Sequence, residues 1–158
     1  MCMALFIAAA EPLETIPWDE SRHGFNVQSI TESEEVVRRH FTMPHVYYAG
    51  AHTGCSCGFT YGLLDVKDVA DEDEDAAGRR SVADLQRYLA VAVARLGEVQ
   101  LFSAWEGDFD EDAEQQLAVT PDWFGGGSFN LPERVEFRVT AGPPNRPLEP
   151  SSGTGTSS

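Results

Sequence analysis

Apolar residues along the chain predict a core built mainly from β-strands. Met3–Ala9 is continuously apolar and free of breakers, as is typical of a central strand. His45–Ala51 and Val99–Trp105 are rich in β-forming residues and predict two more strands. Apolar residues alternate with charged ones over Val135–Val139, which indicates a strand with one exposed face. A weaker alternation predicts a short strand over Phe25–Ile30.

Three segments show the signals of helices. Thr31–Glu34 forms a capping-box pattern, which predicts a short helix through Phe41. Ser81–Asp84 repeats this pattern, and Gly97 is suited to end the helix that follows. Apolar residues in that helix step by three and four, which places Val82, Leu85, Leu89, Ala92 and Leu96 on one face. The acidic stretch Glu106–Glu114 predicts a third helix that ends near Val119.

This order of elements predicts one α+β domain over residues 1–140. We expect a mixed or mainly antiparallel sheet with two to three helices on one face. Residues 65–80, with five consecutive acids at their centre, are expected to form an acidic mobile loop. Residues 141–158 are rich in Pro, Gly, Ser and Thr and contain few large apolar groups, so we expect a disordered tail.

The charge of the chain restricts its partners. The chain has 26 acidic and 11 basic residues, and its formal net charge is −15. Such a charge repels phosphate backbones and anionic membrane surfaces, so neither nucleic acid nor a membrane is an expected partner. High solubility is the simplest consequence, and a basic protein or a bound cation is the partner that fits best. The charge does not indicate an oligomeric state.

The location of the protein is inferred from its first residues and its cysteines. The apolar start is too short to cross a bilayer, and the first basic residue is Arg22, so we expect no signal peptide. Three cysteines without regular spacing are not typical of a secreted disulfide framework. We therefore expect a cytoplasmic protein.

The segment His52-Thr53-Gly54-Cys55-Ser56-Cys57-Gly58 is the strongest candidate for chemistry. Imidazole and thiolate are the ligands that Zn²⁺ prefers, so His52, Cys55 and Cys57 predict a metal site. A closed zinc site needs four ligands, and the fourth could be Cys2, His45, His40 or His23. Cys2 is attractive because the first strand could lie beside the third. Copper(I) is the second candidate ion, since soft thiolates favour it.

Two other interpretations of this segment remain open. A thiol nucleophile would need a depressed pKa, and His52 could supply a nearby cation for Cys55. An enzyme could also use a bound metal to activate water. The simplest alternative is that these small residues only fill a tight turn, with Phe59–Leu64 leaving it as a second hairpin strand.

Other motifs do not complete a site. Two acidic stretches, from Asp71 and from Asp108, begin like calcium loops, but both lack the glycine at position six and the glutamate at position twelve. Gly125–Ser128 lacks the lysine of a phosphate-binding loop. The function that we expect is therefore a non-catalytic interaction or regulatory role with a small metal site, and an enzyme is the alternative.

Overall fold

The computed structural model describes residues 2–63, 68–142 and 146–147 of the 158-residue chain. They form one long α-helix, three 3₁₀ helices and seven strands. In chain order these are β1 (Met3–Ala9), β2 (Asn26–Ser29), η1 (Glu32–His40), β3 (His45–Gly50), η2 (Ser56–Gly58), α1 (Val69–Leu96), β4 (Glu98–Trp105), β5 (Gln115–Val119), η3 (Pro121–Trp123), β6 (Val135–Thr140) and β7 (Arg146–Pro147).

The strands form a single mixed sheet in the order β2-β3-β1-β4-β6-β5-β7. Among the described strands, β5 and β6 pair in parallel, and all other neighbours pair antiparallel. The prediction of an α+β fold with a mixed sheet is confirmed. β1 lies inside the sheet between β3 and β4, and all seven of its residues are buried, as its unbroken apolar sequence predicts.

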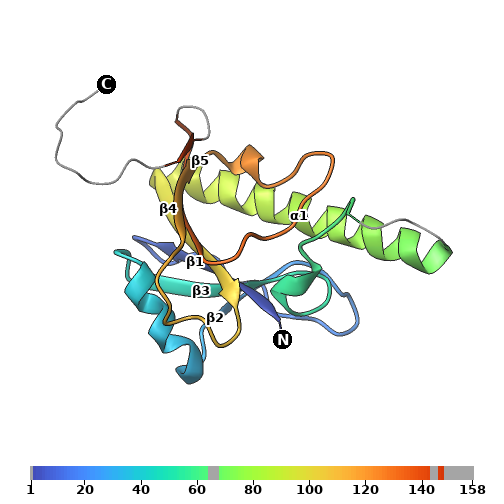
Figure 1. Cartoon of the computed structure of the whole chain (residues 1–158), viewed down its shortest axis with the longest axis horizontal. Helices are drawn as coiled ribbons and strands as arrows, with labels where there is room; N and C mark the ends of the chain where they lie inside the picture. The colour runs from blue at the N-terminus through green and yellow to red at the C-terminus, as the bar shows by residue number, and fades with distance from the viewer. Residues whose placement is uncertain (1, 64–67, 143–145, 148–158) are drawn as a thin grey trace.

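Helices cover both faces of the sheet, which corrects the expectation that they share one face (Figure 1). Side chains alternate between faces along a strand. Leu5 and Ile7 belong to the larger core with α1, whereas Phe6 belongs to a smaller core with Val37 of η1. β1 is continuously apolar because both of its faces are covered.

The acidic stretch before Ser81 is helical, in contrast to the mobile loop expected over 65–80. α1 begins at Val69, and the Asp68 side chain caps it by accepting a hydrogen bond from the Asp71 backbone N–H at 2.9 Å. Carboxylates are favoured near the positive end of a helix dipole, and Glu and Ala are good helix formers. Residues 65–67 of the expected loop lie outside the described residues.

Two further segments differ from the prediction. Gln115–Val119 is strand β5, where a helix was expected, because its backbone pairs with β6 and β7. No strand leaves the cysteine turn over the described part of Phe59–Leu64, where Tyr61 makes one isolated bridge with Phe129. In the expected disordered tail, Arg146–Pro147 pairs with β5, whereas 143–145 and 148–158 lie outside the described residues.

A buried histidine connects η1 to the sheet. His40 Nδ1 lies 2.8 Å from Glu136 Oε2, and its Nε2 lies 2.8 Å from the Phe109 carbonyl oxygen. Its ring stacks on Phe102. Burial of Glu136 raises its pKa, but hydrogen bonds with His40 and Gln116 outweigh this and hold the pKa below its ordinary value of 4.5. The ionised carboxylate therefore stabilises the folded state.

We expect Glu136→Gln to lower the free energy of unfolding by about 1–3 kcal/mol at pH 7. A carboxyl group with a lowered folded-state pKa stabilises the fold above its ordinary pKa and loses this contribution as the pH falls through the lowered value. Urea unfolding of both proteins between pH 7 and pH 3 measures the difference, which should shrink below about pH 4.5. The exposed change Glu133→Gln is the control. A difference that stays constant with pH would refute this role.

Candidate metal centre

The fold brings all three cysteines together. Their Sγ atoms lie within 4.8 Å of one another, close enough for one metal ion. Cys2 immediately precedes β1, whereas Cys55 and Cys57 lie on the loop that follows β3. Because β1 and β3 are antiparallel, with Leu5 opposite Ala49, the start of β1 lies beside the end of β3. The expectation that Cys2 lies near the other two cysteines is therefore confirmed.

Backbone hydrogen bonds form the loop that carries Cys55 and Cys57. The Gly54 N–H donates to the Ala51 carbonyl, and the Ala51 N–H donates to the Cys55 carbonyl, both at 3.0 Å. Gly54 has a φ of +86°, which favours glycine. A Cβ at this position would lie 3.3 Å from the Trp18 ring, so this indole packs directly on the turn before Cys55.

Ser56 connects the loop to the sheet from between the two cysteines. Its buried Oγ accepts a hydrogen bond from the Leu5 N–H at 2.9 Å and donates one to the Ala49 carbonyl at 2.6 Å. Its own N–H donates to the Tyr48 hydroxyl at 3.0 Å. One side chain thus holds the loop against both β1 and β3 and determines where the two neighbouring thiols point.

We expect Ser56→Ala to destabilise the protein by about 1–3 kcal/mol, since it leaves the buried Leu5 N–H and Ala49 carbonyl without these partners. Thermal or urea unfolding measures the loss. Ser29→Ala, on an exposed position of β2, should change stability by less than about 0.5 kcal/mol. Equal stabilities of the Ser56 and Ser29 variants would show that the Ser56 hydrogen bonds do not hold the loop.

The thiols differ in their hydrogen bonds and their pKa values. The Met3 N–H donates to Cys57 Sγ at 3.2 Å. Burial, followed by interactions with Cys2 and Cys55, raises the pKa of Cys57 to about 12. Burial also raises the pKa of Cys55, but hydrogen bonds with Thr53, Cys57 and Cys2 outweigh it, and the net result is a lowered pKa.

The structure does not bring His52 into the group of thiols. Its Nδ1 lies 3.0 Å from Ser81 Oγ, and its Nε2 lies 2.7 Å from Glu74 Oε1, so the imidazole binds the loop to α1. The sequence could not show this, because both partners lie more than twenty residues further along the chain.

The other three histidines also lie elsewhere. His40 contacts Glu136, and His23 stacks on Trp18 with ring centroids 5.1 Å apart. His45 begins β3, opposite Ala9 at the far end of β1 from Cys2. Among the described residues, Cys2, Cys55 and Cys57 form the one group of three or more His, Cys, Asp or Glu side chains arranged to hold a metal ion.

In the described part of the chain, the centre offers three thiols and no fourth His, Cys, Asp or Glu side chain, and this limits the ions that it can bind. Thiolate sulfur is a strong ligand for Zn²⁺ and for copper(I). Structural zinc sites use four protein ligands, whereas catalytic zinc sites have three and keep one position open for water or substrate. The cysteine centre is thus suited to a soft ion that retains one exchangeable ligand.

No protein-family model, curated protein or solved structure matches this chain. None of the helices in the described residues is both long enough and apolar enough to cross a membrane. The geometry of the cysteine centre is therefore the main guide to function.

Proposed function

We propose that this protein is a non-catalytic metal-binding domain in which Cys2, Cys55 and Cys57 hold a zinc ion. The observation that supports this proposal is the convergence of three sulfur atoms from two segments more than fifty residues apart. A cysteine that only fills space needs no sulfur neighbours. Cys57 also accepts a backbone N–H hydrogen bond, which stabilises a thiolate ligand.

Zinc is the first choice among the candidate ions. Water would hold its fourth position until a side chain of a partner replaces it and completes the four protein ligands of a structural site. Copper(I) is the second choice, since thiolates bind it well. Both ions require reduced cysteines, and the three described cysteines form no disulfide. A reducing compartment such as the cytoplasm suits this chemistry.

The metal would serve a structural and regulatory role at one edge of the fold. It would link the start of β1 to the loop after β3, next to the hydrogen bonds of Ser56. Loss of the ion would free the first residues of β1 and the Cys55–Cys57 loop together. Because this chain has a net charge of −15, a basic protein is the partner that would associate fastest with its surface.

Protection of the thiols tests this function. The reduced protein is treated with N-ethylmaleimide, with and without one equivalent of Zn²⁺, and mass spectrometry counts the modified cysteines. We expect zinc to protect all three thiols and to protect His52→Ala equally well. Modification of all three cysteines at unchanged rates in the presence of zinc would refute the site. Loss of protection in His52→Ala would restore His52 as a ligand.

A thiol enzyme is the second candidate, and the lowered pKa of Cys55 favours it. However, the His52 ring contacts Ser81 and Glu74, so it is not positioned as a base for Cys55. The rate of thiol alkylation in protein purified without a chelator distinguishes the enzyme from the metal-binding domain. An enzyme requires one rapidly alkylated thiol near pH 7, whereas a filled metal centre should show none.

A further inference from the structure

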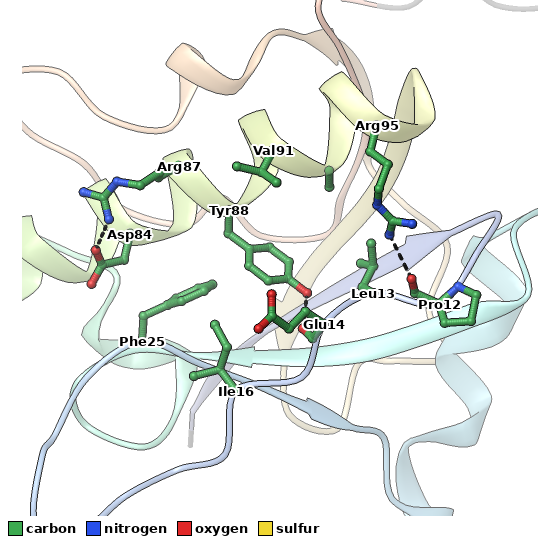
Figure 2. Close-up of a pocket in the computed structure, with 11 residues that line it drawn as sticks. Pro12, Leu13, Glu14, Ile16, Phe25, Asp84, Arg87, Tyr88, Val91 and Arg95 are labelled. Atoms are coloured by element: carbon green, nitrogen blue, oxygen red, sulfur yellow. Dashed lines mark hydrogen bonds and ion pairs between the residues drawn. The ribbon is translucent and has the colours of Figure 1, made fainter.

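A cavity of about 640 Å³ lies between α1 and the segment that follows β1 (Figure 2). Small-molecule sites are usually 300–1,000 Å³ and mainly apolar, with a few polar groups that orient the ligand. None of the three cysteines lines this cavity. Any ligand of the cavity would therefore bind independently of the metal centre.

The apolar walls of the cavity are held in place by direct contacts. The Tyr88 and Phe25 rings lie 5.4 Å apart at an angle of 59°. The Tyr88 hydroxyl donates to the Glu14 carbonyl at 2.5 Å, and burial raises its pKa, so it stays protonated at neutral pH. Val91 also lines the cavity, and its side chain is 64% exposed.

An arginine lies at each end of the cavity, and the two arginines differ in whether they form an ion pair. Figure 2 shows Arg87 at one end and Arg95 at the other, with Tyr88 and Val91 between them. Arg87 is paired with Asp84 at 2.7 Å. Arg95 donates to the Pro12 carbonyl at 2.9 Å and forms no ion pair within the described part of the chain.

The guanidinium of Arg95 is thus oriented and still has N–H donors for an anion. A guanidinium carries five N–H donors, and its bonds to carboxylates are among the strongest that side chains form. Glu14 lines the cavity near Tyr88 and would repel an anionic group there. An anion would therefore be confined to the Arg95 end, and the apolar walls would hold an uncharged body.

We propose that this cavity binds a small amphipathic carboxylate, whose apolar body packs between Tyr88, Phe25 and Val91 and whose carboxylate binds Arg95. The strongly acidic surface disfavours anions in general, so binding of this ligand depends on the contact between its carboxylate and Arg95. Medium-chain fatty acids and arylalkanoic acids share this chemistry.

The dye 1-anilinonaphthalene-8-sulfonate, an aromatic body with one anionic group, is the probe. Its fluorescence is titrated with the full-length protein, and decanoate is then added as competitor. We expect one dye per chain, displaced by decanoate. Arg95→Glu should weaken binding at least about tenfold, since it removes a charge-assisted hydrogen bond and adds repulsion. Val91→Asp should weaken it as well. Arg80→Glu makes the same change of charge on an exposed position of α1 outside the cavity and should have little effect.

Several outcomes would overturn this proposal. Equal dye affinity in Arg95→Glu and Arg80→Glu would show that the anionic group does not contact Arg95. Equal displacement by decanol and decanoate would show that the cavity binds neutral apolar molecules. Absence of dye fluorescence, or fluorescence that appears only when the near-ultraviolet circular dichroism of the protein is lost, would show that the folded cavity binds no such ligand.

Discussion

Leu89→Asp is expected to unfold the domain at room temperature. Leu89 lies on α1 with 0% exposure and packs in the larger core between this helix and the sheet. Removal of a buried leucine side chain alone costs about 2–5 kcal/mol. Burial of a carboxylate in its place adds several more, against a total stability of about 5–15 kcal/mol for an ordinary domain. Circular dichroism should show no cooperative thermal transition.

Val91→Asp is the matched control for this change. It introduces the same carboxylate two residues further along α1, at a position that is 64% exposed. We expect this variant to remain folded and to melt within a few degrees of the parent protein, because the carboxylate stays in water. A folded Leu89→Asp protein, or unfolding of both variants, would show that the wrong face of α1 has been assigned to the core.

Gly78→Ala is expected to destabilise the protein, although alanine usually stabilises a helix relative to glycine. A Cβ at position 78 would lie only 2.0 Å from the Thr60 carbonyl oxygen. α1 can approach the cysteine loop this closely only because residue 78 has no side chain. We expect a loss of about 1–3 kcal/mol or more, since either the helix or the Gly58–Thr60 backbone must move.

Gly127→Ala provides the comparison for this prediction. A Cβ at Gly127 would contact nothing within 4 Å, and the backbone there does not have a positive φ. We therefore expect a change below about 0.5 kcal/mol. Chemical unfolding of the two variants measures both effects. If Gly78→Ala is as stable as the parent protein, the contact between α1 and Thr60 is looser than the structure shows.

The parts of the fold that could be predicted have a local signal. β1 matches its predicted bounds, because an unbroken apolar run indicates a strand buried on both faces. β5 could not be recognised, because Gln115 and Gln116 are exposed and its strand state depends on pairing with β6 and β7. Similarly, the sequence of the first turns of α1 is so acidic that it resembles a solvated loop. In the structure Asp68 caps these turns, and they are helical.

The candidate site was also predictable only in part. The Cys-x-Cys spacing indicated two ligands, and the expected neighbourhood of the first and third strands indicated Cys2. His52 is adjacent in sequence, but it turns toward Ser81 and Glu74, because a helix that begins at Val69 brings these two side chains to it. An acidic loop over residues 65–80 gave no reason to expect these two partners, so the spacing alone suggested His52 as a ligand.

The metal content of the protein tests the central claim most directly. The untagged protein, purified without chelator under reducing conditions, is analysed for zinc and copper per chain by plasma mass spectrometry. The proposed centre predicts close to one zinc per chain in the parent protein and in His52→Ala, and almost none in Cys2→Ser or in the double variant Cys55→Ser, Cys57→Ser. Absence of metal from the parent protein after incubation with Zn²⁺ or copper(I), or equal metal content in the cysteine variants, would contradict it.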